Sequence, residues 1–540
     1  MTGRAAACFA AAVLPLVGPV LAATAQRYAA AAPAITPVTM SASCRPEAAA
    51  EVDLGAAWLL VRADTIARGA FDRAVDLDPD CALGYWGQAL ARFDEAASGS
   101  ESVIATVETI IARAAAVPAR TPFERAAVAA LVRLRSREAA PGVAAAWPAR
   151  LTAYRDALCA GAAADRGIRL WCARALADAW TSLPASRLVP GVSADVPALD
   201  HVVELARSHP LDVGASVIVL EVAPDPRAPI VTRALTTIAT ANPPAAAPHA
   251  LAARIASRRG EWAAAVIAAE RARASGPDDP RAVETLPVQI DALLQLGRRA
   301  EAYALAHRAL SSAGAAGGPA ALSAARLYAR VVLGDRRIDA RGLGDRSALT
   351  LDERTAGLWP VVFVAGLDAA VRAWPGPDPD LVSRARAAMD RLDALATDAH
   401  PSDARPSEIA WARTLIDAAV AASQDEHPDL ALRLAHAIDI ERTLAAADPS
   451  TLPLLPAREL GAELWLRTYR YDDARRDARS VLEDQPQRIS PFVVLARGSA
   501  RVQDTAAAAE AWRRVLELRA TADADDTIRL EAQRALAARP

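Results

Sequence analysis

The sequence predicts an all-α fold, a right-handed α-solenoid (superhelix) of stacked helical hairpins. The first indication is a pattern that occurs twice in succession between residues 455 and 522, offset by 34 positions. Small residues stand where helices would touch, with a bulky residue four further on, as in Ala508 and Trp512. The second indication is composition: 53% of the chain is hydrophobic but only 4% aromatic, and the abundant alanine is the best helix former. Such a hairpin cannot bury its apolar face alone and must stack on neighbours.

The first 25 residues are typical of a signal peptide. Arg4 provides a positive start, residues 5–21 form an uncharged apolar run, and small residues follow at a possible cleavage site. A retained membrane anchor is the alternative, but Pro15 and Pro19 interrupt the run and it is short for a span. No later stretch is long and apolar enough to cross a bilayer. We therefore expect a periplasmic or secreted mature chain.

Residues 26–43, rich in Ala, Pro, Thr and Ser, are predicted to form a flexible leader before an N-terminal helical block at 44–182. Pro79 ends the first hairpin of this block, because proline commonly follows a helix end. The predicted helical segments of the block are 48–62, 66–77, 82–93, 102–138 and 147–182.

A segment rich in Pro and Ser, residues 183–200, is predicted to connect this block to a central block at 201–340. The repeat pattern resumes there. Gly260 and Gly297 hold the same position of two successive repeats, 37 residues apart.

Residues 341–408 predict an irregular helical segment, because prolines such as Pro360 are expected to break its helices. A C-terminal block at 409–522 contains the two clearest repeats. Residues 523–540 are predicted to form the capping helix that a solenoid needs over its last apolar face.

Short motifs spread along most of the chain give a second line of inference. They are Ser43-Cys44, Ala70-Phe71-Asp72-Arg73-Ala74, Asp78-Pro79-Asp80-Cys81-Ala82-Leu83-Gly84-Tyr85-Trp86-Gly87, Thr121-Pro122-Phe123-Glu124-Arg125, Gly260-Glu261-Trp262 and Pro456-Ala457-Arg458-Glu459-Leu460-Gly461. Together they resemble a family of exported bacterial tetratricopeptide (TPR) repeat proteins without an assigned biochemical activity. The resemblance implies a solenoid of TPR-like helical hairpins.

The resemblance implies that relatives in this family carry a His-rich centre, which would suggest a metal site. In the corresponding stretches of this chain, histidine remains only at His209 and His249. His201 could share a helix face with His209 only if that helix reached Pro210. We therefore predict no metal site and no cofactor. A metal- or small-ligand-binding cavity near residues 201–260 is the alternative to protein binding.

Composition excludes several kinds of chemistry. The chain contains no lysine, so no Schiff-base lysine and no phosphate-loop lysine can exist. The net charge is −3, with acidic and basic residues interleaved, which argues against a nucleic-acid partner. No metal-binding, nucleophile-elbow or dinucleotide-binding motif occurs. We therefore expect a protein that is not an enzyme.

Binding of a protein or peptide along the concave groove of the solenoid is the predicted function. In TPR-like repeats the first helix of each hairpin lines the groove. The predicted groove residues are Trp86, Leu90, Phe93, Arg254, Arg258, Glu459, Glu463, Arg467, Arg497 and Arg501. The groove would hold a peptide through side-chain pockets and carboxylate–guanidinium pairs. Alternatively, Trp86 packs between repeats and the arginines are solvated. The sequence identifies neither the partner nor the oligomeric state.

Four cysteines remain after removal of the signal peptide, and an even number in an exported chain favours disulfides. In the first predicted hairpin, Cys44 and Cys81 lie just outside the adjoining open ends of the two antiparallel helices. In the hairpin that turns near Asp165, Cys159 lies opposite Cys172. This geometry favours Cys44–Cys81 and Cys159–Cys172 among the three possible connectivities. Free, buried thiols are the alternative.

Overall fold

The computed structural model contains helices and no β-strand among the residues that it describes, which confirms the predicted all-α fold. The described residues are 35, 38–97, 100–134, 147–160, 166–181, 203–204, 206–209, 211–222, 225–277, 279–313, 318–335, 357–374, 376, 378–398, 406–447 and 453–538. The predicted signal peptide and the predicted connector at 183–200 lie outside them. Within the described residues, no helix is both long enough and apolar enough to span a membrane.

The chain divides into two compact units. The first comprises Met1–Ser182 and Val196–Leu251, and the second comprises Leu183–Asp195 and Ala252–Pro540. The division falls inside helix α13 (Ala246–Arg259), within the predicted central block.

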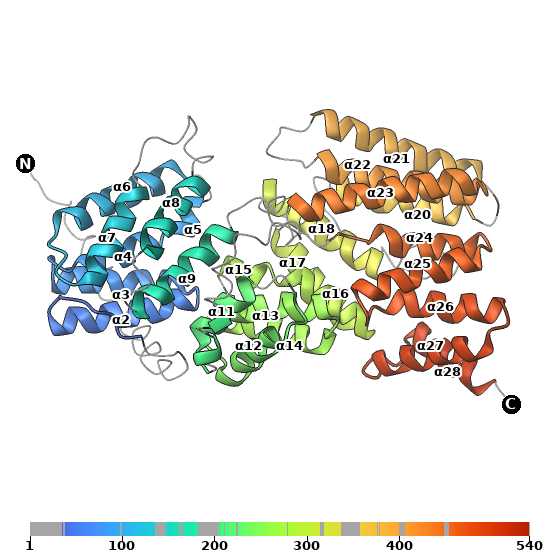
Figure 1. Ribbon diagram of the computed structural model, residues 1–540. Helices are drawn as coiled ribbons and strands as arrows, with labels where there is room; N and C mark the ends of the chain where they lie inside the picture. The colour runs from blue at the N-terminus through green and yellow to red at the C-terminus, as the bar shows by residue number, and fades with distance from the viewer. Residues whose placement is uncertain are drawn as a thin grey trace, which may run out of the picture. The chain divides into compact units, whose positions relative to one another are not determined.

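The first unit is a stack of helices in which most helices pack on their neighbours in sequence. These helices are drawn in blue to green in Figure 1. They are α2 (Pro46–Leu60), α3 (Asp64–Leu77), α4 (Ala82–Leu90), α5 (Phe93–Ala97), α6 (Glu101–Ala116), α7 (Pro122–Leu134), α8 (Trp147–Cys159), α9 (Arg166–Thr181), α11 (Val213–Val222) and α12 (Pro229–Ala241). Helix α11 also returns to contact α2, so a late helix of this unit packs on its first hairpin.

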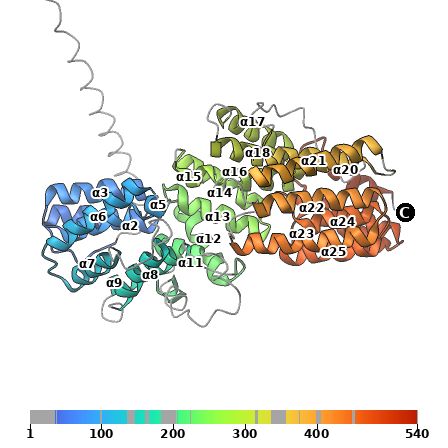
Figure 2. The ribbon, with the colours of Figure 1, turned by 90° about the horizontal axis from the view of Figure 1, so that it is seen from above.

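The second unit is also built of stacked helical hairpins. Its helices are α14 (Trp262–Ser275), α15 (Pro280–Val283), α16 (Leu286–Leu296), α17 (Arg299–Ala313), α18 (Gly318–Gly334), α20 (Trp359–Arg372), α21 (Pro379–Asp398), α22 (Pro406–Ser423), α23 (His427–Ala447), α24 (Ala457–Arg467), α25 (Tyr471–Asp484), α26 (Ile489–Arg501), α27 (Thr505–Leu518) and α28 (Thr527–Ala537). Figure 2 shows α20, α21, α22 and α23 side by side, and successive members of this group contact one another.

One kind of tight turn joins the two helices of several hairpins. The residue with positive φ in these turns is Arg62, Gly260, Gly297, Asp425, Tyr469 or Gln503. The next amide donates back to a carbonyl in the last turn of the first helix, as Arg470 N does to Trp465 O at 2.9 Å. This is the hydrogen bond of a Schellman motif, which satisfies carbonyls that the helix leaves unpaired.

The repeats predicted at the C-terminus are present. Helices α25 and α27 begin 34 residues apart, at Tyr471 and Thr505. Each buries three residues at matching positions, which are Ala474, Ala478 and Val481 in α25 and Ala508, Trp512 and Val515 in α27. Helix α28 then covers this last apolar face with Ala532, in one core cluster with Trp512 and Val515.

The segment predicted to be irregular is a regular hairpin over much of its length. Pro360 lies in the first turn of α20, where its missing N–H is one that a helix leaves unpaired in any case. Proline therefore begins this helix instead of breaking it. Helix α21 follows and is 20 residues long.

Close helix packing in the first unit depends on glycine. A Cβ atom on Gly87 would lie 2.1 Å from the Phe71 ring, and one on Gly55 would lie 2.8 Å from the same ring. Both distances are shorter than any real contact, so Phe71 fills the space that these two glycines leave. Phe71 itself is fully buried.

Candidate interaction surfaces

Both predicted disulfides are present in the structure. Cys44–Cys81 and Cys159–Cys172 each have a Cα–Cα distance of 4.9 Å. The first joins Cys44, which precedes α2, to Cys81, the N-cap residue of α4, and the second joins α8 to α9. Loops of these sizes, closed over 37 and 13 residues, stabilise by about 3 kcal/mol each in the chain-entropy model.

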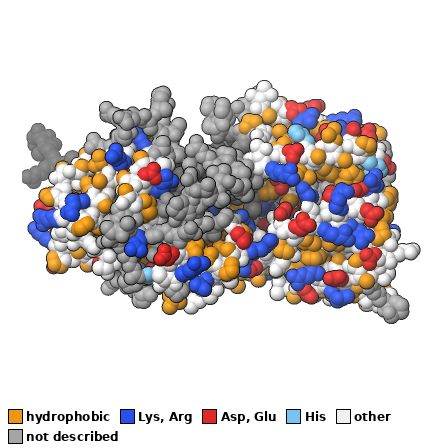
Figure 3. All heavy atoms as spheres, in the orientation of Figure 1, with side chains coloured by type: hydrophobic (Ala, Val, Ile, Leu, Met, Phe, Trp, Pro, Cys, Tyr) orange, Lys and Arg blue, Asp and Glu red, His pale blue; other side chains and the backbone are white. Residues whose placement is uncertain are grey.

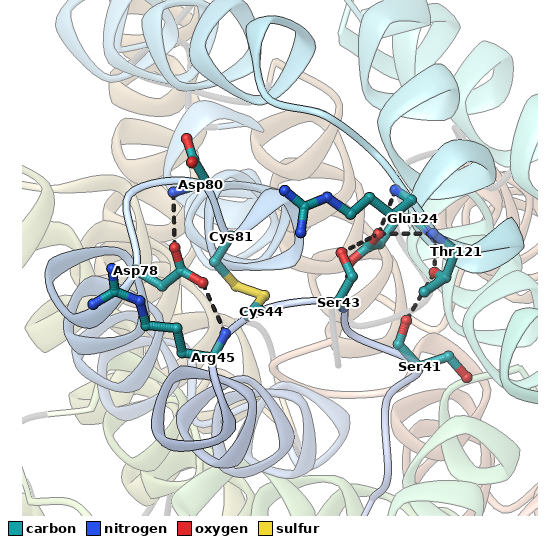
Figure 4. Close-up of a disulfide and its surroundings, with 10 residues drawn as sticks. Ser41, Ser43, Cys44, Arg45, Asp78, Asp80, Cys81, Thr121 and Glu124 are labelled. Carbon is teal, nitrogen blue, oxygen red and sulfur yellow. Dashed lines mark hydrogen bonds between the residues drawn. A yellow bond between two sulfur atoms is a disulfide. The ribbon is translucent and has the colours of Figure 1, made fainter.

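The first disulfide anchors a short N-terminal strap, residues 40–45. Figure 4 shows Ser43 of the strap beside Glu124 of α7, with the disulfide on the other side. The Ser43 amide and hydroxyl both donate to the Glu124 carboxylate, at 2.6 and 2.8 Å. The end of the predicted flexible leader is therefore held in place, because hydrogen bonds and a covalent bond fix it to the helices.

Glu124 is fully buried and also belongs to a capping box. The Thr121 hydroxyl accepts from the Glu124 amide at 3.0 Å, while the Glu124 carboxylate accepts from the Thr121 amide at 2.9 Å and from the Arg120 amide at 2.7 Å. This reciprocal arrangement satisfies unpaired donors at the start of a helix. The same carboxylate thus fixes the beginning of α7 and the strap.

The predicted apolar groove residues of the first unit lie mainly in its core. Trp86 is fully buried, packs edge-to-face on Trp171 with ring centroids 4.7 Å apart, and donates to the Tyr154 hydroxyl at 3.2 Å. Phe93 is buried and packs edge-to-face on Tyr154. Leu90 is half-buried. Trp86 and Phe93 are therefore not accessible to a partner, and packing between repeats accounts for both.

The predicted charged groove residues of α24 are buried as well. The side chain of Glu459 is only 1% exposed and forms an ion pair with Arg488, which also lies 3.5 Å from Asp291 of α16. Glu463 accepts a hydrogen bond from the Ser490 hydroxyl at 2.5 Å. These carboxylates thus contact other parts of the second unit instead of facing an open groove.

Arginines at other predicted groove positions differ in their surroundings. Arg467 is buried and donates to Val371 O at 3.2 Å. Arg497 forms a two-fold hydrogen-bonded ion pair with Glu531 of α28, at 2.9 and 2.6 Å. Arg501 is exposed, as is Arg258, while Arg254 is half-buried.

The second unit closes on itself, which explains why its predicted groove residues are buried. The Trp262 indole donates to Gln487 O at 2.7 Å, and the Gln295 side chain accepts from the Ile489 amide at 2.9 Å. These contacts join the first hairpins of the unit to its last repeats. An open superhelix would keep those elements apart, so the rule that the first helices line a free groove does not apply here.

Burial shifts the pKa values of charged groups in this interior. Burial lowers the pKa of Arg330, and the neighbouring charge of Asp291 partly offsets the effect. Burial also raises the pKa of Glu441, which the hydrogen bond from the Ala457 amide partly counteracts. Charges enclosed in this way need their counter-charges, because an unpaired buried charge is costly.

A different set of residues is exposed where the hairpins turn. Tyr469, in the α24/α25 turn, is 64% exposed. Its ring centroid lies 5.9 Å from Trp374, which follows α20, and 6.4 Å from Tyr471. Trp374 and Tyr471 are half-buried, and Arg470 lies over the ring of Trp465. We call Trp374, Tyr469, Arg470 and Tyr471 the aromatic turn edge.

His209 and His249, in the predicted central block, each contact a different neighbour. His209 is half-exposed and its Nδ1 lies 2.8 Å from the Ser208 hydroxyl. His249 is buried, with Nε2 2.9 Å from Pro243 O. His201 lies outside the described residues. The structure, in the part that it describes, brings no three His, Cys, Asp or Glu side chains together in a way that could hold a metal.

Helix α11, from the stretch that the resemblance aligns with a His-rich centre, carries an ion-paired carboxylate. Glu221 lies 2.8 Å from both Arg62 Nε and Arg174 Nη1, and all three side chains are largely buried. The three groups link α9, α11 and the α2/α3 turn. These ion pairs hold the helices together.

Comparison with known proteins yields structural likenesses only. No protein-family model and no curated protein matches the sequence. The chain is similar to the TPR domain of P58(IPK), with 12% identity over 91% of this chain and 98% of that one and a TM-score of 0.20. It is also similar to the APC/C hetero-tetramer Cut9–Hcn1 (11% identity, 90% and 96% covered, TM-score 0.24) and to Naa15/Naa10 bound to HypK-THB (14%, 90% and 70%, 0.25). At these TM-scores the likenesses carry no conclusion about function, so the helical-hairpin description is based on this chain's own helices and turns.

Proposed function

We propose that the chain is a non-enzymatic protein-binding scaffold of the cell envelope, and that its second unit contacts a partner through the aromatic turn edge. The observation that carries this proposal is the exposure of Tyr469 beside Trp374 and Tyr471. Trp, Tyr and Arg are the residues most enriched among those that dominate binding energy at protein interfaces.

The large aromatic side chains elsewhere make the contrast clear. Trp58, Trp86, Trp171, Phe71 and Phe363 are all almost completely buried. Among the described residues, Tyr469 is the only exposed side chain of a Phe, Trp or Tyr, and the half-buried rings of Trp374 and Tyr471 lie beside it.

Two features support placement in the cell envelope. The Cys44–Cys81 and Cys159–Cys172 disulfides suit an oxidising compartment such as the periplasm. The predicted signal peptide would direct the chain there.

The distribution of charge on the surface of the second unit favours a protein partner and argues against a nucleic-acid partner. In Figure 3, Arg side chains on this unit are interspersed with Asp and Glu and form no continuous basic area on the face shown. The predicted groove positions that remain at least partly exposed, Leu90, Arg254, Arg258, Arg497 and Arg501, stay predictions as secondary contacts.

Photo-crosslinking tests the proposal. A benzophenone amino acid replaces Tyr471 in the full chain, expressed in its own host, and a second variant carries the same group at Leu432. Leu432 is an exposed apolar residue of α23 and serves as the matched control. We expect a discrete protein adduct from position 471 and none of that mass from position 432. No protein adduct from 471, or the same adduct from both positions, would contradict the proposal.

A further inference from the structure

We infer that the aromatic turn edge binds an acidic, proline-containing, extended segment of the partner, and that Tyr469 is kept in an unfavourable backbone conformation for this contact. This inference rests on the proposed function and specifies the chemistry of the partner. Backbone geometry, ring geometry and the exposure of the guanidiniums support it.

The backbone of Tyr469 has φ +61°, in the left-handed region that bulky side chains rarely adopt. The same turn position holds Gly260 and Gly297 in two other hairpins, at φ +75° and +76°, and glycine has no steric penalty there. It also holds Arg62, Asp425 and Gln503, at φ +62°, +55° and +62°, so Tyr469 is the one aromatic residue among these six turns. With 64% of its surface exposed, Tyr469 gains little from core packing. Backbone strain of this kind is concentrated at functional sites, which points to a role for the ring outside the fold.

The three rings are inclined to one another and do not form a flat stack. The Trp374 and Tyr469 planes are inclined by 54°, and those of Tyr469 and Tyr471 by 80°. Domains that recognise proline-rich segments in the polyproline II conformation do so through aromatic side chains that line their binding grooves. That conformation rises about 3.1 Å per residue, so two of its residues match the 5.9 and 6.4 Å ring spacings.

The charged residues that flank the rings in sequence favour an acidic segment. Arg372 is 49% exposed whereas its partner Asp368 is 7% exposed, and Arg470 is 51% exposed whereas Asp473 is 18% exposed. In each pair the guanidinium is more exposed to solvent than the carboxylate. Asp472 is the exception, since it is almost fully exposed at the start of α25. Two exposed guanidiniums can each bind a carboxylate of the partner.

Fluorescence anisotropy with the purified full chain tests the partner's chemistry. The probe is a labelled peptide of alternating Glu and Pro residues, and the matched controls alternate Gln and Pro or Lys and Pro. We expect saturable binding of the Glu peptide that weakens with added salt, and binding of both controls weaker by about tenfold or more. No saturable binding of the Glu peptide, or equal binding of the Lys peptide, would overturn the inference.

The Tyr469→Gly variant tests the role of strain, with Gln503→Gly as its control. Gln503 holds the same left-handed position in the next repeat, at φ +62°. Tyr469→Gly should lose about tenfold or more in affinity for the Glu–Pro peptide while its Tm is no lower than that of the wild type. Gln503→Gly should bind as the wild type does. A lowered Tm for Tyr469→Gly would show that its ring serves the fold, and unchanged affinity would show that it does not bind the peptide.

The two proposals fail in different ways. A protein adduct from position 471 without binding of the Glu–Pro peptide would leave the scaffold function in place and refute the acidic-segment inference. Absence of any adduct would refute the scaffold function itself.

Discussion

Replacing Arg488 with methionine should loosen the interior of the second unit, because it leaves two buried carboxylates without their shared counter-charge. Arg488 pairs with Glu459 and lies 3.5 Å from Asp291, and the three side chains are 8%, 1% and 9% exposed. Breaking a buried pair by removing one partner costs about 3–5 kcal/mol. We expect the lower end of this range, since Arg330 also lies near Asp291.

Arg497→Met is the matched control for this change. Arg497 also forms an ion pair, with Glu531, but the two side chains are 23% and 31% exposed. A pair that solvent reaches contributes about 0–1 kcal/mol. The double variant Arg488→Met with Glu459→Met should recover part of the loss, because it removes one of the carboxylates left unpaired.

Hydrogen exchange read out by mass spectrometry is the appropriate assay, because it reports the stability of each region separately. Faster exchange is expected in α16, α24 and α26, which meet at Arg488, and little change is expected in the first unit. If Arg488→Met destabilised these helices no more than Arg497→Met does, the interior would be solvated and the closure of the second unit would be incorrect.

Three further predictions follow from packing and charge. Gly87→Ala should destabilise the first unit by about 1–3 kcal/mol through overpacking, because the new methyl group would overlap Phe71; an unchanged thermal denaturation curve would contradict this. Trp512→Ala should cost about 3–5 kcal/mol and speed hydrogen exchange from about residue 455 to 540, since repeats couple to nearest neighbours; uniform loosening of the whole chain would argue against such local coupling. Burial raises the pKa of Glu441 above 4.5, so the folded state favours its protonated form and loses stability as pH rises from the unfolded pKa through the raised one. Glu441→Gln should therefore flatten the dependence of Tm on pH in this range and exceed the wild type at neutral pH, and parallel Tm profiles would refute the assignment.

Local features of the fold could be predicted from the sequence because each is encoded within a few dozen residues. Ala474 and Ala508, or Val481 and Val515, occupy the same position of successive repeats, and each is buried. The disulfides could be predicted for the same reason, since Cys44 and Cys81 flank one hairpin.

Contacts between distant repeats could not be predicted in this way. Gln295 and Ile489 are 194 positions apart, and no periodic pattern reports that they meet. The groove prediction assumed an open superhelix, so it placed Glu459 and Glu463 at a surface. Their burial is a consequence of closure, which depends on the sum of many small rotations between hairpins.

The aromatic turn edge was missed although a signal was present. Aligning the repeats sets Tyr469 against Gln503, 34 positions later, and glycine occupies the matching turn at Gly260 and Gly297. Arg62 and Asp425 occupy this turn position in other hairpins, so the signal is the bulky aromatic ring of Tyr469 at a left-handed position, a local conflict of the kind expected at functional sites. Its neighbour Trp374 comes from another hairpin, and only the structure brings the two rings together.

The most direct test of the central claim is hydrogen exchange of the full chain with and without the protein that crosslinks to position 471. The account predicts slower exchange of the amides at 373–374 and 468–471, next to the aromatic turn edge, and no change in α16 or α24. Protection confined to α16 and α24, with the turns unaffected, would show that the partner enters the interior of the second unit and would contradict the account.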